Sequence, residues 1–195
     1  MDKIILISGL KQSGKNWSSK ILKDLLIADG KIVVEKSFAY WMKYMLSTTM
    51  GVSMARFEQL KEDNISIFDD DMRELNTTAR EMLQKFGTDV MYPMFGETIW
   101  ADLAVKDLKE TVQSGVVIFT DFRHDHEYEA IINEYGKCVT IRIEDGRTAL
   151  PTDHDSERNL TDANFQFDYI VDNSSKDDSI ITKMQEIFKE IKDGK

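Results

Sequence analysis

The chain has 195 residues, of which 42 % are hydrophobic and 31 % charged, a composition typical of one globular domain with a substantial core. Asp and Glu number 35 against 25 Lys and Arg, so the formal net charge of −10 argues against a polymeric nucleic acid as partner. The single cysteine, Cys138, permits no internal disulfide and stands in an apolar run that predicts a buried thiol. The N-terminal apolar run is too short for a signal peptide or a membrane span. We therefore expect a cytoplasmic protein that does not bind membranes.

The first predicted element is a strand at Ile4–Ser8, and the loop after it has the pattern Gly9-x-x-x-x-Gly14-Lys15. Such a loop curls its backbone N–H groups around a phosphate, and its lysine reaches the outer phosphates of the same nucleotide. A helix follows, with apolar residues at 21, 22, 25 and 26, and adds the positive end of its dipole. The pattern therefore predicts a bound nucleoside triphosphate. Asn16 stands where a Ser or Thr normally ligates magnesium.

Four further short apolar runs predict strands, and helical periodicities lie between the runs. The predicted strands are Ile32–Glu35, Val116–Thr120, Val139–Ile143 and Tyr169–Val171, and the periodicities cover residues 99–108, 128–132 and 180–191. Nearly continuous apolar runs are typical of parallel strands that are buried on both faces. We therefore predict an α/β fold, a three-layer sandwich with a five-stranded parallel sheet between helices.

The stretch between the second and third strands contains no convincing strand and is far longer than a simple crossover needs. We predict a helical insertion at residues 38–112, within a core domain formed by residues 1–37 and 113–195. Inside the insertion, Thr77–Phe86 predicts a helix that ends at Gly87-Thr88-Asp89.

Two polar residues of that helix, Arg80 and Gln84, are four positions apart and therefore share one face. An arginine suits a phosphate and an amide suits a base edge, so the pair fits an acceptor nucleotide. An ordinary solvated helix face is the alternative interpretation.

The third predicted strand leads directly into Asp121-Phe122-Arg123. An acid at the tip of a strand beside a phosphate-binding loop is where such folds hold magnesium or its water shell. Arg123 points to the same side of an extended chain and suits a phosphate. An ordinary Asp–Arg ion pair at a strand end is the alternative.

The segment after the fourth strand, residues 144–160, is polar and carries Arg147 and Arg158. A mobile lid that brings an arginine onto transferring phosphates has this composition, although a plain surface loop has it too. Arg142, inside the strand, is a further candidate. Asn173 follows the last strand, either at an edge where adenine rests or in a turn before a helix that Ser174 or Ser175 caps.

These segments together resemble the phage-type deoxynucleoside monophosphate kinases, P-loop enzymes of the nucleoside monophosphate kinase superfamily. The motifs are SGLKQSGK, FAYWMK, AREMLQKFGTD with Trp100 after it, TDFRHDHE, HDSERNL and DYIVDN. The resemblance implies transfer of the γ-phosphoryl group of ATP to a deoxynucleoside monophosphate, with Mg²⁺ and a closing lid. We expect a monomer or a homodimer in the cytoplasm, that of the host if the gene belongs to a phage.

The resemblance and the motifs lead to four sets of expected site residues. For ATP they are Gly9, Lys11, Ser13, Gly14, Lys15, Asn16 and Asn173. For the acceptor they are Lys43, Arg80, Gln84 and Trp100. For catalysis they are Lys15, Asp121, Arg123 and Arg147, and for Mg²⁺, directly or through water, Asn16 and Asp121.

Two other functions stay open at this point. Phosphomevalonate kinases share parts of the P-loop and the His154-x-Ser156-Glu157 pattern, which allows a kinase of another small phosphorylated metabolite. Asn16 favours a nucleotide-binding regulatory module with little turnover.

Overall fold

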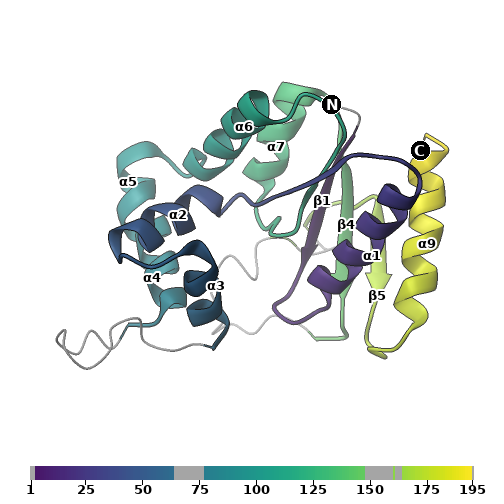
Figure 1. The fold of residues 1–195 in the computed structure, drawn as a ribbon, viewed down its shortest axis with the longest axis horizontal. Coiled ribbons are helices and arrows are strands. Elements are labelled where there is room, and N and C mark those ends of the chain that lie inside the picture. Colours follow the sequence, from purple (N-terminus) through teal and green to yellow (C-terminus); the bar gives the residue numbers. More distant parts are fainter. Residues whose placement is uncertain (1–2, 64–76, 148–159, 161–163, 195) are drawn as a thin grey trace. The chain divides into compact units, whose positions relative to one another are not determined.

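The computed structural model describes residues 3–63, 77–147, 160 and 164–194. Its centre is a five-stranded parallel sheet in the order β2-β3-β1-β4-β5 (Figure 1). The strands are β1 (Lys3–Gly9), β2 (Val33–Lys36), β3 (Val116–Phe119), β4 (Val139–Glu144) and β5 (Tyr169–Asp172). Each overlaps a strand expected from the sequence, and the predicted α/β fold is confirmed.

The described helices join these strands. They are α1 (Lys15–Ala28), α2 (Tyr40–Thr49), α3 (Met54–Asp63), α4 (Ala79–Lys85), the π-helix η1 (Phe86–Met91), α5 (Tyr92–Phe95), α6 (Ile99–Thr111), α7 (Asp125–Tyr135) and α9 (Ser179–Lys192). The chain forms two compact units. We call Met1–Phe38 with Val105–Lys195 the sheet unit, and Ala39–Ala104 the helical unit.

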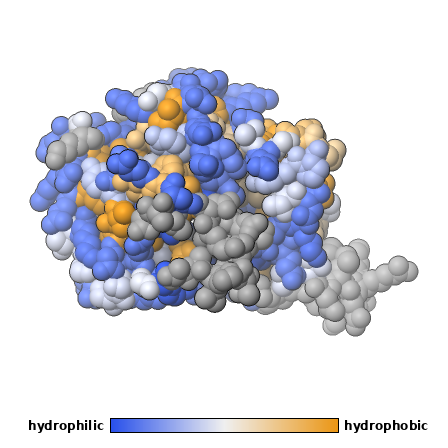
Figure 2. All heavy atoms as spheres, turned by 180° about the vertical axis from the view of Figure 1, so that it is seen from behind, coloured by the Kyte–Doolittle hydropathy of each residue, from blue (hydrophilic) through white to orange (hydrophobic). Residues whose placement is uncertain are grey.

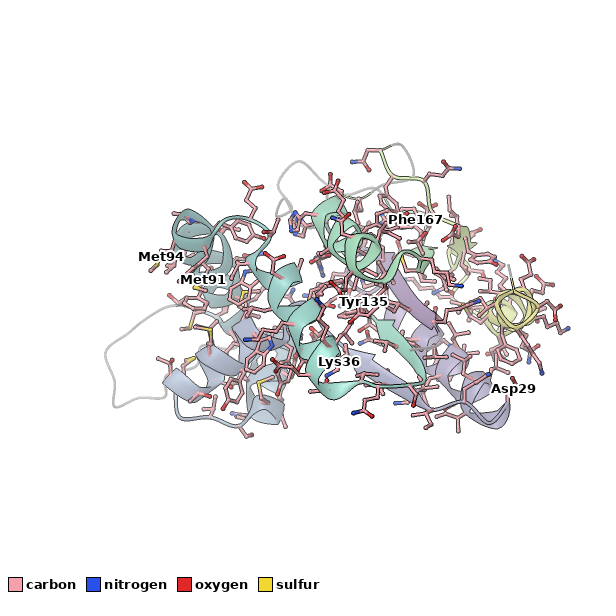
Figure 3. The ribbon with its side chains drawn as sticks, turned by 90° about the horizontal axis from the view of Figure 1, so that it is seen from above. Asp29, Lys36, Met91, Met94, Tyr135 and Phe167 are labelled. Carbon is pink, nitrogen blue, oxygen red and sulfur yellow. The ribbon has the colours of Figure 1, made fainter. Side chains whose placement is uncertain are left out.

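One face of the sheet is covered by α1 and α9, which lie side by side in Figure 1. Inward-facing residues of the strands, such as Ile5, Ile118 and Ile141, are completely buried against Leu22 of α1 and Met184 of α9. At the far end of α1, Asp29 forms an ion pair with Lys192 of α9; Asp29 is labelled in Figure 3. The central strands β1, β3 and β4 are buried along almost their whole length, as their continuous apolar runs predict, whereas the edge strands β2 and β5 are partly exposed.

Aromatic side chains fill the rest of the sheet unit. Phe38 and Phe119 stack with their ring centroids 4.3 Å apart, and both are buried. Phe122, just after β3, contacts Phe165 and Phe167 edge to face. These contacts fix the segment after β3, which carries two of the predicted site residues.

The helical unit has its own core. Its buried residues Leu46, Phe57, Leu60 and Ala79 come from α2, α3 and α4. Partly buried side chains pack around them: Met42, Met50, Val52, Met82, Leu83 and Phe86. Methionine is suited to such a small, irregular core because its side chain is flexible and apolar.

The predicted helix end at Gly87-Thr88-Asp89 is wrong. These residues lie inside η1, and the helix continues into α5. Gly87 has no positive φ of the kind that ends helices, and a Cβ there would lie 3.0 Å from Met42 Sδ. The turn widens instead: Tyr92 N–H donates to Gly87 O, five residues earlier, and Thr88 Oγ1 donates to Gln84 O at 2.7 Å. Packing against Met42 of another helix thus outweighs the local sequence pattern that predicts a helix end at Gly87.

Two further expectations, on the start of the last helix and on the burial of Cys138, also need correction. Neither Ser174 nor Ser175 caps the last helix, because α9 begins only at Ser179, after Asp178. Cys138 is only half-buried, and lines a cavity of about 490 Å³ at the amino-terminal edge of the sheet. Burial raises the pKa of its thiol to about 12.

Hydrophilic residues cover most of the face drawn in Figure 2, and apolar residues appear there in separate areas. Within the described ranges, no helix is long and apolar enough to cross a membrane.

Candidate active site

The loop between β1 and α1 is built so that only glycine fits at two of its positions. Gly9 has φ +150°, and a Cβ there would lie 2.5 Å from Ile143 O and 2.7 Å from Ser13 Oγ. Gly14 has φ +101°, and a Cβ there would collide with the side-chain amide of Asn173. The backbone therefore passes close to the carboxyl end of β4 and to the side chain of Asn173 after β5, which a side chain on either glycine would prevent.

The lysine of this loop is folded back over it. Lys15 Nζ donates to Gly9 O and to Leu10 O, each at 2.6 Å. The Ser13 hydroxyl oxygen is buried, and the described residues offer it no hydrogen-bond partner. Buried donors are nearly always satisfied, so this hydroxyl is suited to a ligand inside the loop. Asn16 and Lys11 are exposed on the same segment.

Two side chains from the carboxyl ends of β4 and β5 bond to carbonyl groups of the loop. Asn173 is buried, and its Nδ2 donates to Ser13 O at 2.8 Å. Arg147 donates to Lys11 O and, through Nε, to Asp145 Oδ2 at 2.7 Å. Burial opposes ionisation of Asp145, but the hydrogen bonds and charge of Arg147 hold its pKa below the ordinary value. The predicted residues Arg147 and Asn173 thus lie directly against the β1–α1 loop.

Asp121 lies just after β3, the strand next to β1. Its Oδ2 accepts from Ser37 Oγ at 2.5 Å and its Oδ1 accepts from Phe38 N at 3.0 Å. The carboxylate is held in one orientation at the strand tip, beside the loop.

Glu127 is a further residue of this region, and it is not among the site residues expected from the sequence. Its carboxyl group is fully buried and accepts from Arg123 N at 2.7 Å and His124 N at 3.0 Å. Burial, and next the negative charge of Asp121, raise the pKa of Glu127 to about 8. Glu127 stands three residues after His124, the spacing of a capping box, which is the signal that indicates this arrangement. It fixes the backbone that carries Arg123.

Of the remaining arginine candidates, Arg142 is buried within the sheet unit. Its Nη1 donates to Ser8 Oγ at 3.1 Å, and its guanidinium lies 5.9 Å from the ring centre of Phe167, labelled in Figure 3. Arg158, with the rest of the 148–159 part of the predicted lid, lies outside the described residues.

In the helical unit, α4 begins with a capping box. Thr78 Oγ1 accepts from Glu81 N, and the Glu81 carboxylate accepts from Thr78 N. Arg80 and Gln84 follow one turn apart. Arg80 Nε is buried, and in the part of the chain that the structure describes it has no hydrogen-bond partner. The indole N–H of Trp100 is also buried and also lacks a hydrogen-bond partner among the described residues. Trp100 as a whole is 4 % exposed.

The predicted acceptor residue Lys43 is paired within the helical unit. Its Nζ lies 2.6 Å from Glu58 Oε1 of α3. Burial of Glu58 favours protonation, but its charges and hydrogen bonds with Lys43 and Lys61 outweigh this and lower its pKa. Trp100 lies 6.2 Å from Phe86, centroid to centroid, beside Gly87.

The model of one protein family, deoxynucleotide monophosphate kinase, matches residues 26–184. The chain belongs to this family. As a deoxynucleotide monophosphate kinase it phosphorylates deoxynucleoside monophosphates, with ATP as the other nucleotide, and the resemblance predicted from the sequence motifs is confirmed. The matched range begins after the phosphate-binding loop, so the interpretation of that loop rests on its own geometry.

The other two comparisons add little. No curated protein matches the chain. A solved structure titled "Crystal structure of APE1195" is similar, with 15 % identity, a TM-score of 0.48, and coverage of 100 % of this chain and 98 % of that one.

Proposed function

We propose that the sheet unit of this kinase binds ATP at the β1–α1 loop and that the helical unit binds the deoxynucleoside monophosphate through α4. The observation that carries the proposal is the loop itself: two glycines whose Cβ positions are already occupied, followed by a lysine at the start of a helix. Backbone N–H groups and a helix N-terminus in this arrangement form a site for the phosphates of a nucleotide.

When ATP binds in the donor site, Lys15 Nζ gives up its hydrogen bonds to the two loop carbonyls and bonds to the outer phosphates instead. Both carbonyl contacts are within the loop, so the ammonium group has only a short way to move. Arg147 and Arg123 supply further positive charge to the phosphoryl group, whose oxygens share the charge of the transition state. Lys11, Ser13 and Asn16 complete the predicted ATP set.

The side-chain oxygen atoms of Asp121 and Asn16 suit Mg²⁺ as ligands. Asp121 is a carboxylate held in a fixed orientation, and Asn16 offers an amide oxygen on an exposed position of α1. Magnesium prefers such hard oxygen ligands and keeps several waters when it is bound with a nucleotide, so few protein ligands suffice. When bound, the ion would neutralise charge on the phosphates.

In the acceptor site, Arg80 binds the monophosphate and Gln84 the base. The support is that Arg80 Nε is buried without a partner among the described residues, which is costly unless a ligand completes it. Lys43 and Trp100 flank this pair in our proposal. Trp100 contributes a buried indole N–H and a large apolar surface.

The reaction needs no covalent enzyme intermediate. An oxygen of the acceptor phosphate forms a bond to the γ-phosphorus of ATP while the bond from that phosphorus to the β–γ bridging oxygen breaks. The products are ADP and a deoxynucleoside diphosphate. The residues named above bind the two nucleotides and stabilise the charge on the transferred group.

A coupled assay of ADP release tests the proposal. The purified chain is given ATP and Mg²⁺ with dAMP, dGMP, dCMP, dTMP or dUMP in turn, and once with no acceptor. We expect turnover that depends on at least one deoxynucleoside monophosphate. Equal ADP release with and without acceptor would instead favour hydrolysis by a regulatory module.

A further inference from the structure

The sequence left two roles open for Asn173, a place at the edge where the adenine of ATP rests or a place in a turn before the last helix. The structure supports another role: we infer that Asn173 is a positioning residue for the phosphate-binding loop, which acts on the triphosphate through Ser13 and Gly14 and does not read the base. This inference rests on the proposed binding of ATP at that loop.

The contacts of Asn173 are with backbone groups on both of its sides. Its side-chain Nδ2 donates to Ser13 O at 2.8 Å, a bond between buried groups that joins residues 160 positions apart. Its own backbone N–H donates to Glu144 O, at the end of β4, at 2.6 Å. The residue is 7 % exposed. A side chain that is anchored in this way has little freedom to turn toward a nucleotide base.

The bond to Ser13 O determines the direction of a neighbouring N–H group. In a trans peptide the C=O and the following N–H point in opposite directions. The amide of Asn173 holds the Ser13 carbonyl on its own side, so the N–H of Gly14 is directed away from Asn173. The bond from Arg147 to Lys11 O does the same for the N–H of Gln12.

The backbone of this segment needs such support. Gln12 has φ +63°, which is uncommon for a residue with a side chain, and Gly14 has φ +101°. Left-handed residues among ordinary ones bring successive N–H groups to one side and form an anion-binding hollow, at a cost in backbone strain. Asn173 stabilises this conformation before any nucleotide arrives. It also fills the space that a Cβ of Gly14 would take, which explains the glycine there.

The affinities for three ligands distinguish a residue that positions the loop from a residue that contacts the base. ATP, GTP and inorganic tripolyphosphate share the triphosphate group, and only ATP carries adenine. We measure their dissociation constants by calorimetry with the wild-type chain and with Asn173→Ala and Asn173→Leu. The leucine variant keeps the branched shape without the N–H donor. Asn133→Ala, at an exposed position of α7, is the control.

Loss of the hydrogen bond to Ser13 O is expected to raise the dissociation constants of all three ligands by the same factor, about 10-fold. Asn133→Ala is expected to bind the three ligands like the wild type. A loss confined to ATP would overturn the inference in favour of an adenine contact. Unchanged affinities with a lowered melting temperature would also overturn it, because they would make Asn173 purely structural. If the wild-type chain itself bound none of the ligands, the proposed ATP site would fail, a result distinct from either of these.

Discussion

The phosphate-binding loop and the α4–η1 segment differ in how fully their polar groups are satisfied. In the loop, the carbonyls of Lys11 and Ser13 are held by side chains that follow β4 and β5, and Lys15 bonds to two carbonyls. In α4 and its surroundings, two buried N–H donors, Arg80 Nε and Trp100 Nε1, have no partner among the described residues. In the first region, bonds to backbone carbonyls hold the loop in shape, and of its buried side-chain groups Ser13 Oγ lacks a partner among the described residues. In the second region, the unpaired groups are N–H donors of a guanidinium and of an indole.

This difference has a physical consequence. A loop whose backbone is already held in one conformation binds its anion at little cost in conformational entropy. A site with buried, unsatisfied donors discriminates against ligands that cannot satisfy them, because those donors then stay unpaired. We therefore expect the donor site to bind any triphosphate and the acceptor site to select its nucleotide.

The largest effect is expected at Lys15. Lys15→Ala removes the ammonium group from the phosphates in the transition state, and kcat is expected to fall by about 1,000-fold or more. Steady-state turnover and the circular dichroism spectrum are measured together, since the fold should remain. Lys20→Ala, one turn further along α1 at an exposed position, is the control and should retain turnover. Near-normal activity of Lys15→Ala would contradict the proposed donor site.

The next effect concerns the region with unsatisfied donors. Arg80→Ala is expected to raise KM for the deoxynucleoside monophosphate by about 10- to 100-fold, as loss of a charge-assisted hydrogen bond implies, and to leave KM for ATP nearly unchanged. Arg56→Ala, at an exposed arginine of the same unit, provides the comparison. Should both KM values rise together, Arg80 does not belong to the acceptor site.

What the sequence predicts well is local. The strands follow from continuous apolar runs, and the loop follows from the spacing of Gly9, Gly14 and Lys15. What it misses depends on distant contacts. The bond from Asn173 to Ser13 joins residues 160 positions apart, and no local pattern encodes it. The helix stop at Gly87 failed because Met42 and Trp100 pack against that glycine, and their positions are set by other helices.

A further effect, on stability and not on turnover, is expected from Glu127 of α7, whose carboxyl group holds the backbone after β3. Its pKa is raised from 4.5 to about 8 in the folded chain, so the folded state holds this proton more tightly than the unfolded state does. The free energy of unfolding should therefore fall as the pH rises from about 4.5 to about 8, by up to roughly 1.4 kcal/mol per pH unit. Glu127→Gln keeps an oxygen acceptor and cannot ionise, so its stability should fall less steeply.

Urea unfolding at several pH values, in EDTA and without nucleotide, measures this slope. Glu129→Gln, at an exposed position of the same helix, should keep the wild-type slope. Parallel curves for Glu127→Gln and the wild-type chain would mean that Glu127 does not titrate in this range.

The smallest effect tests the wide turn of η1. Thr88→Val removes the hydroxyl that donates to Gln84 O at 2.7 Å while it keeps the branched shape of the side chain. In a π-turn the backbone N–H groups pair five residues back, so this hydroxyl supplies a contact at the four-residue spacing that the backbone gives up. We expect a loss of about 1 kcal/mol in the free energy of unfolding and a few-fold rise in KM for the acceptor.

Thr49→Val is the matched control, since Thr49 Oγ1 donates to Met45 O at 2.8 Å within the regular helix α2. Equal losses in the two variants, with KM unchanged, would show that the wide turn has no special need of Thr88 and no part in placing Gln84.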